Sequence, residues 1–281
     1  NAGIWRYHPT KRTFEVFAHG TSNPWGVDFN DYGQCFLTAC VIPHLYHMIQ
    51  GARYERQGGQ HFNPYTYDDI KTIADHRHYV GNQWRDADRA KSDDQGGGHA
   101  HAGAMIYLGG TWPEKYRGAI FMNNIHGARI NMDTLTPSGS GYVGSHGPDF
   151  IRTNDLWSQI INLQYGPDGD VYLIDWYDKN QCHRVERDVH DRTNGRIFKV
   201  SYLSDSHNET GGIRTGPELF KSKLRLQGDE SARSATNITP LRLPPGKPID
   251  LRKFSDEELV ANGVHPNDWY VRHSRRLLQE R

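Results

Sequence analysis

The feature that most constrains the fold is a strand–turn–strand unit that recurs along the chain. Residues 25–39 (WGVDFNDYGQCFLTA) and 161–175 (INLQYGPDGDVYLID) each hold a short apolar strand, a four-residue turn ending in glycine, and a second strand. The turns NDYG and GPDG place Asn, Asp and Pro where they favour chain reversal, and the closing glycine suits a positive φ. A third copy has strands at 104–108 and 119–123, joined by a longer insert. The pattern predicts an all-β repeat.

Further apolar segments supply outer strands for each unit. They lie at 44–49, 128–133, 149–153 and 195–202, and residues 3–20 resemble the last two strands of a preceding unit. Short strands joined by turns rather than helices favour a β-propeller, in which blades of about four strands surround a channel. The count predicts about three to four blades, fewer than the smallest usual propeller. We therefore expect the chain to be a piece of a longer protein.

The character of the sequence changes near residue 203. We predict propeller blades over 1–203, from the C-terminal part of a propeller, and a polar linker or extended wrap over 204–250, where Gly, Ser and Pro are scattered. Residues 251–281 are predicted to begin a module of helical repeats. Ser255 and Glu258 have the spacing of a capping box, and Asn267 or Asp268 is placed to cap a second helix.

Composition excludes some classes of partner. The 281 residues include 33 Lys and Arg and 33 Asp and Glu, so the formal net charge is zero and nothing indicates binding to nucleic acid. No stretch approaches the ~18 apolar residues of a membrane-spanning helix. Cys35, Cys40 and Cys182 form no CxxC and no CxxCH haem attachment motif. Cys35 and Cys40 either form a disulfide or are buried free thiols.

The segment QGGGHAHAGAMIYLGG (95–110) contains the first candidate functional residues. If 104–108 is the inner strand of a blade, the preceding loop lies at one mouth of the channel, and its glycines allow close approach of another chain or a ligand. His99 and His101 are two residues apart, so both side chains point the same way in an extended chain. Such a pair suits metal binding or proton transfer. The alternative is a structural histidine bonded to a neighbouring blade.

Other polar residues are predicted to reach the same mouth because they flank strands of other blades. These candidates are Asn23, Asn124, His126, Arg129 and Arg192. Polar groups gathered at strand ends are typical of a ligand site. The alternative is that they only close turns.

A long insertion at 63–94 separates two blades. Long loops in compact domains are often functional. Its Asp68, Asp69 and Asp75 either join a metal site or belong to a solvated loop, and no EF-hand spacing is present. The sequence identifies no metal.

Six long motifs carry a family resemblance. They are HGTSNPWGVDFNDYGQ, NPYTYDDIKTIADHRHY, GGGHAHAGAMIYLGGTWP, MNNIHGARIN, GPDGDVYLIDWYDK and DRTNGRIFKV. Together they resemble, over most of residues 3–202, the membrane-bound dehydrogenase domain of planctomycete and verrucomicrobial proteins. More distantly, the chain is similar to the quinoprotein glucose and sorbosone dehydrogenases, six-bladed propellers that use pyrroloquinoline quinone and calcium.

The resemblance implies an oxidoreductase that oxidises a sugar or other hydroxylated substrate and passes electrons to a downstream cytochrome c domain. It also implies HEAT-like repeats after the propeller and an exported, periplasmic or cell-surface location. His101, with His99 and His126 beside it, would contact the substrate or accept its proton. The residues expected to orient cofactor or ligand oxygens are Asn23, Asn124, Arg129 and Arg192.

The sequence also departs from the quinoprotein pattern. Ser22 stands where those enzymes have an arginine before the asparagine, and no Gly-Pro turn follows the next strand. Their general-base histidine belongs to a blade that precedes this segment. These departures favour an alternative function, a non-catalytic propeller that binds polysaccharide or a protein partner.

Overall fold

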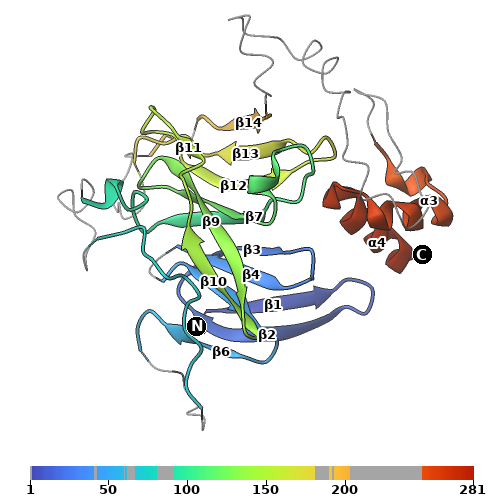
Figure 1. Ribbon diagram of the computed structural model, residues 1–281, viewed down its shortest axis with the longest axis horizontal. Helices are drawn as coiled ribbons and strands as arrows, with labels where there is room; N and C mark the ends of the chain where they lie inside the picture. Colours follow the sequence, from blue (N-terminus) through green and yellow to red (C-terminus); the bar gives the residue numbers. More distant parts are fainter. Residues whose placement is uncertain are drawn as a thin grey trace, which may run out of the picture. The chain divides into compact units, whose positions relative to one another are not determined.

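A computed structural model describes the protein over residues 2–40, 43–59, 61, 67–80, 91–180, 190–191, 193–202 and 249–281. The chain divides into two compact units, Asn1–Val200 and Ser201–Arg281. The linker predicted at 204–250 lies almost entirely outside the described residues. The described strands all belong to the first unit, where they form four sheets (Figure 1).

The first two sheets have three strands each. One has the order β1–β2–β6, with β1 Gly3–His8, β2 Thr13–Thr21 and β6 Arg53–Arg56. The other has the order β3–β4–β5, with β3 Pro24–Phe29, β4 Cys35–Ala39 and β5 Leu45–Met48. Neighbouring strands are antiparallel except β2 and β6, which are parallel.

The third sheet is the largest and the fourth is again a three-stranded meander. The third sheet has the order β10–β9–β8–β7, and β11 also pairs with β9. Its strands are β7 His101–Ile106, β8 Ile120–Asn124, β9 Arg129–Ser138, β10 Gly141–His146 and β11 Ile151–Arg152. The fourth contains β12 Ile160–Tyr165, β13 Val171–Asp175 and β14 Arg196–Val200. Strands β7 and β8 are buried along their whole length, whereas β13 alternates buried and exposed residues.

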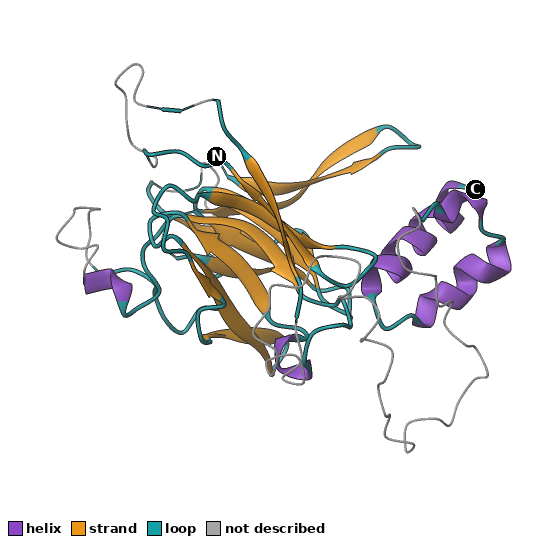
Figure 2. Cartoon of the chain, turned by 90° about the horizontal axis from the view of Figure 1, so that it is seen from above, coloured by secondary structure: helices purple, strands orange, loops and turns teal. Residues whose placement is uncertain are grey.

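The first strands of the last three sheets, β3, β7 and β12, lie side by side. Between β3 and β7, the side chain of Asp28 accepts a hydrogen bond from Ile106 N at 2.7 Å. A Cβ added at Gly26 would lie 2.3 Å from Ala104 N, so the two backbones touch only because Gly26 has no side chain. Successive sheets of three to five strands around neighbouring inner strands form part of a β-propeller that does not close, as the sequence predicts (Figures 1 and 2).

The predicted strand pairs correspond to β3–β4, β7–β8 and β12–β13, and the N-terminal pair to β1–β2. Two strands were not predicted. Strand β10 follows a Ser- and Gly-rich turn and carries little apolar sequence. Strand β6 pairs in parallel with β2 across more than thirty residues of chain, a pairing without a local signal.

The described part of the second unit is helical. It contains the 3₁₀ turns η4 Leu251–Lys253 and η5 Asn262–Val264 and the helices α3 Asp256–Ala261 and α4 Asp268–Glu280; a further 3₁₀ turn, η1 Glu114–Tyr116, lies in the first unit. The predicted capping box of Ser255 and Glu258 is confirmed, and Asn267 caps α4. Among the described residues, no helix combines the length and the apolar character needed to span a bilayer.

Candidate metal centre

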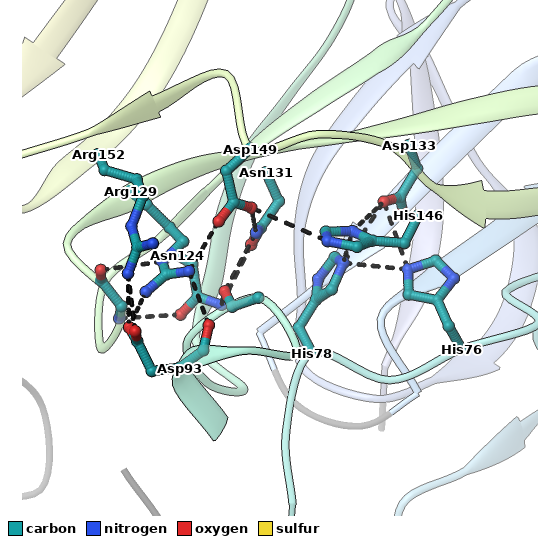
Figure 3. Close-up of polar contacts among 12 residues, drawn as sticks. His76, His78, Asp93, Asn124, Arg129, Asn131, Asp133, His146, Asp149 and Arg152 are labelled. Carbon is teal, nitrogen blue, oxygen red and sulfur yellow. Dashed lines mark hydrogen bonds and ion pairs between the residues drawn. The ribbon is translucent and has the colours of Figure 1, made fainter. Parts of the chain in front are cut away.

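Five histidines and one aspartate gather in the first unit. His101 begins β7, Asp133 lies in β9, His146 ends β10, His44 precedes β5, and His76 and His78 come from the long insertion. The side chains of His44, His78, His101 and Asp133 are buried, while those of His76 and His146 are 17% and 30% exposed. Figure 3 shows His76, His78 and His146 around the Asp133 carboxylate.

Residues 67–80, here called the strap, hold His76 and His78 in place. Its backbone bonds to edge strands: Ile70 N donates to Arg53 O in β6 at 2.9 Å, and Ile73 N donates to Leu45 O in β5 at 3.1 Å. Asp75 N donates to Gly144 O in β10 at 3.0 Å. Because the strap is anchored immediately before His76, the two histidines reach the same buried position from one segment.

Four potential ligand atoms lie close together. Oδ1 of Asp133 lies 3.3 Å from His76 Nε2, 3.4 Å from His78 Nε2 and 3.6 Å from His146 Nδ1. Nε2 of His78 lies 3.0 Å from His76 Nε2 and 2.9 Å from His146 Nδ1. A tetrahedral site with metal–ligand bonds of about 2.0–2.1 Å has edges of about 3.3 Å. These five distances, 2.9–3.6 Å, lie near the edge length expected for a tetrahedral metal site.

Oδ1 of Asp133 makes no hydrogen bond with any described residue, although Asp133 is fully buried. A buried carboxylate oxygen without a hydrogen bond is costly. The short contacts of His78 Nε2 with His76 Nε2 and with His146 Nδ1 are also unfavourable by themselves. Two imidazole lone pairs repel each other unless a proton or a cation lies between them. A cation at the centre would satisfy all four ligand atoms.

Partners behind two of the ligands orient them. His44 Nε2 lies 2.9 Å from Oδ2 of Asp133, whereas His76, His78 and His146 make their closest contacts with Oδ1. His76 Nδ1 lies 2.9 Å from Oδ1 of Asp75, which leaves His76 Nε2 with a lone pair toward the centre. His44 belongs to the same group of potential ligands, in which one atom each of His44, His76, His78 and Asp133 lie within 4.8 Å of one another. Because His44 contacts the other oxygen, we assign it the orienting position.

The remaining two ligands also have partners. His78 Nδ1 lies 2.8 Å from His101 Nε2. His146 Nε2 lies 4.0 Å from Oδ1 of Asp149, which also accepts a hydrogen bond from Asn131 Nδ2 at 2.7 Å. Each potential ligand thus has a second residue beside it, an arrangement typical of metal sites in proteins.

The electrostatics favour the protonation states that a metal needs at Asp133 and His78, whereas at His76 they favour the protonated ring, with which a metal would have to compete. Burial by itself would raise the pKa of Asp133, but the surrounding histidines hold it well below its ordinary value, so the carboxylate is charged. Burial lowers the pKa of His78 to about 4, which keeps this ring neutral at pH 7. Burial also opposes protonation of His76, yet Asp133 and Asp75 raise its pKa overall.

The three glycines of the motif at 95–110 shape the chain around His78. Gly96, Gly97 and Gly98 have φ of +115°, +95° and +147°, a region that other residues rarely adopt. A Cβ at Gly96 would lie 2.5 Å from His78 Cδ2, and Gly98 N donates to His78 O at 2.7 Å. The glycines therefore allow the close approach of another segment of the same chain.

Of the predicted catalytic residues, only His101 lies in the cluster. His99 and His126 form a separate pair with ring centroids 4.7 Å apart, and the ring of Tyr79 is 5.1 Å from that of His99. Asn23 is exposed, has φ of +46° and lies just before β3. Arg192 lies outside the described residues.

Asn124 and Arg129 are buried beside the cluster and are already engaged within the protein (Figure 3). Asn124 Nδ2 donates to Gly96 O and Gly98 O at 2.9 and 2.8 Å. Arg129 forms ion pairs with Asp93 and, at 2.7 Å, with Asp149. Their contacts support a structural role, and the cofactor role predicted for them stays a prediction.

The donors of the cluster do not fit the calcium implied by the resemblance. Calcium takes oxygen ligands, whereas three of the four atoms here are imidazole nitrogens. The donors of Asn124 and Arg129, which were expected to face a quinone, bond instead to backbone and carboxylate oxygens of the chain. The cluster fits a transition metal better than calcium.

The sequence reasoning missed most of this site. The unpredicted members are His44, His76, His78, Asp133 and His146. One signal was present: the pair in DHRHY (75–79) has the same spacing as His99 and His101. Asp75 lies behind a potential ligand, whereas Asp69 pairs with Arg53 and Asp68 is exposed.

Comparisons with known proteins identify one family and several distantly similar structures. Residues 1–204 match the model of a family described as a domain of unknown function (DUF7133). Similar solved structures include an oxidoreductase described as a glucose dehydrogenase from Thermus thermophilus (15% identity, TM-score 0.42, covering 66% of this chain and 47% of that chain). Others are the aldose sugar dehydrogenases of Streptomyces coelicolor in its PQQ-bound form (14%, 0.39, 66% and 44%) and of Escherichia coli in its apo form (13%, 0.38, 66% and 47%). The chain spans less than half the length of these structures, and no curated protein matches it.

Proposed function

The chain belongs to the DUF7133 family, and we propose that its first unit is a propeller segment that binds a divalent first-row transition metal. The ligands are His76 Nε2, His78 Nε2, His146 Nδ1 and Asp133 Oδ1. The observation that carries this proposal is the buried Asp133 Oδ1, which lacks a hydrogen bond among the described residues and has three imidazole nitrogens 3.3–3.6 Å away.

The ligand set narrows the choice of metal. Three imidazoles and one carboxylate suit zinc, copper, iron or nickel, whereas calcium and magnesium prefer oxygen alone. The ligands come from the strap and from β9 and β10, so the ion would cross-link the strap to the third sheet. A ligand that binds only the folded state stabilises it by about 2.7 kcal/mol at a concentration of 100 Kd.

The experiment is a metal titration of the full chain after treatment with a chelator. We expect one Zn²⁺ or Co²⁺ per chain, measured by calorimetry and elemental analysis, with a rise in Tm of about 5–10 °C at saturation. The variant Asp133→Asn keeps the shape of the side chain but removes its charge, and it should lose the Tm rise. Asp69→Asn is the matched control, because Asp69 belongs to the strap but pairs with Arg53 outside the cluster. Equal binding by both variants, or no stoichiometric binding by the wild type, would overturn the proposal.

A second candidate function is the oxidation of a sugar or other hydroxylated substrate, with electrons passed to a cytochrome c domain. It is supported by the motif resemblance over 3–202 and by an imidazole-rich ligand set that also suits the redox metals copper and iron. The assay is dye reduction with a panel of sugars and alcohols after loading with copper, iron or zinc, and separately with pyrroloquinoline quinone and calcium. Reduction that requires copper or iron and is lost in Asp133→Asn supports this function at the cluster. No reduction under any condition favours the non-catalytic propeller that binds polysaccharide or a protein.

A further inference from the structure

His101 belongs to the cluster of histidines but does not face the four potential ligand atoms. It is the first residue of β7 and is 1% exposed. Its Nε2 lies 2.8 Å from His78 Nδ1, on the side of the His78 ring opposite the proposed metal. Its ring stacks on that of His44, with centroids 4.6 Å apart and planes at 26°. The position of His101 is thus set by a buried strand and by a residue that itself orients Asp133.

We infer that His101 is a positioning residue of the metal centre: its Nε2 accepts a hydrogen bond from His78 Nδ1–H and thereby turns the lone pair of His78 Nε2 toward the metal. The inference rests on the proposed function. Carboxylates and backbone carbonyls are the usual acceptors behind a metal-bound histidine. Here a second histidine takes that place, and its orientation leaves it no direct access to the ion.

The tautomers follow from the donor count. A neutral imidazole has one N–H and one lone pair, so only one of His78 Nδ1 and His101 Nε2 carries the proton between them. When His78 Nε2 binds a metal, the proton of His78 must lie on Nδ1. His101 then accepts at Nε2 and carries its own proton on Nδ1, an atom without a hydrogen-bond partner among the described residues.

In the metal-free chain, the hydrogen bond between the two rings is expected to run from His101 Nε2 to His78 Nδ1. With the proton of His78 on Nε2, that N–H points toward the nitrogens of His76 and His146, 3.0 and 2.9 Å away, and toward the charged Asp133 carboxylate. His101 then donates from Nε2 and keeps a lone pair, rather than an orphan N–H, at its buried Nδ1. Metal binding therefore reverses the hydrogen bond between the two rings and moves the proton of His101 from Nε2 to Nδ1.

Two variants test the positioning role in the full chain. In His101→Gln, the amide oxygen takes roughly the place of Nε2 and can accept the hydrogen bond, whereas His101→Leu offers no acceptor. We expect His101→Leu to weaken the Zn²⁺ Kd by about 10–100-fold, measured by competition with a chelator, and to alter the visible spectrum of bound Co²⁺. His101→Gln should restore most of the affinity and the wild-type spectrum. Wild-type affinity and spectrum in His101→Leu would overturn the inference.

A measurement on the wild-type chain tests the proposed tautomers even if a variant fails to fold. Long-range ¹H–¹⁵N correlation spectra of histidine-labelled protein report which ring nitrogen carries the proton. With Zn²⁺ bound, both His78 and His101 should be protonated at Nδ1; without metal, His101 should be protonated at Nε2. A proton on His101 Nε2 in the Zn²⁺-loaded chain would overturn this inference while leaving the metal site intact. Failure of the wild type to bind Zn²⁺ would overturn both proposals.

Discussion

Substituting Gly96 with alanine should damage the metal centre through the His78 ring. The new Cβ would lie 2.5 Å from His78 Cδ2 and 2.8 Å from Cγ, well inside van der Waals contact. The ring has little freedom to move, because Nδ1 is 2.8 Å from His101 Nε2 and Nε2 lies among the other ligands. Gly96 cannot retreat either, since its carbonyl accepts hydrogen bonds from Asn124 and Asn131 at 2.9 and 3.1 Å.

Two contributions set the magnitude. A φ of +115° is strained for alanine and costs about 1–3 kcal/mol. Overpacking against a ring that cannot move costs about another 1–3 kcal/mol. Gly96→Ala should therefore lower the free energy of unfolding by about 2–6 kcal/mol. It should also weaken Zn²⁺ binding, because His78 can avoid the methyl group only by leaving its position beside His76 and His146.

The assay is denaturant unfolding of the full chain, followed by fluorescence with and without Zn²⁺, alongside a Zn²⁺ titration. Gly118→Ala is the matched control: its φ is +76°, and an added Cβ would meet no described atom within 4 Å. The control should lose only about 1–2 kcal/mol and keep wild-type affinity for Zn²⁺. Equal losses of stability in the two variants, with unchanged Zn²⁺ affinity in Gly96→Ala, would refute the reasoning.

Two further predictions concern the propeller itself. Gly26→Ala places a methyl group 2.3 Å from backbone atoms of β7 and should lower the free energy of unfolding by about 1–3 kcal/mol. The control Gly58→Ala, with no described atom near its Cβ, should change the Tm little. Equal Tm values for the two variants would contradict the close packing of β3 on β7. Burial, with a smaller contribution from Asp28, raises the pKa of Cys35 to about 12, so this free thiol should resist iodoacetamide at pH 8 in the folded chain and react once unfolded. Mass spectrometry of the alkylated peptides measures this, and rapid native modification at Cys35 would show that the site is open.

The parts of the fold that were predictable are those specified over short distances. The hairpins β3–β4 and β12–β13 each combine an alternating or apolar strand, a turn with Asn, Asp or Pro, and a closing glycine, all within fifteen residues. The pairings that were missed join distant segments. Strand β6 depends on β2, and the strap depends on the edges of β5, β6 and β10. No periodicity within these segments indicates their partners.

The site was harder to predict for the same reason. Its potential ligands come from the strap, β9 and β10, so only the pairing of those elements brings them together. His76 and His78 have the same spacing as His99 and His101, but the latter were favoured because a recognisable inner strand follows them. The insertion lacks such a strand, so its sequence gives no reason to place its histidines at the mouth of the channel. The same two-residue spacing occurs at both places, but only the fold shows that the pair in the insertion lies beside Asp133.

The glycine run and His101 act together on a residue from another segment. Gly98 N bonds to the carbonyl of His78, Gly96 leaves room for its ring, and His101 contacts the far nitrogen of that ring from β7. The motif therefore holds His78 through both its backbone and its side chain while contributing no ligand of its own. In the proposed metal site, the motif therefore accommodates a ligand from another segment, and His101 contacts that ligand on the side away from the metal.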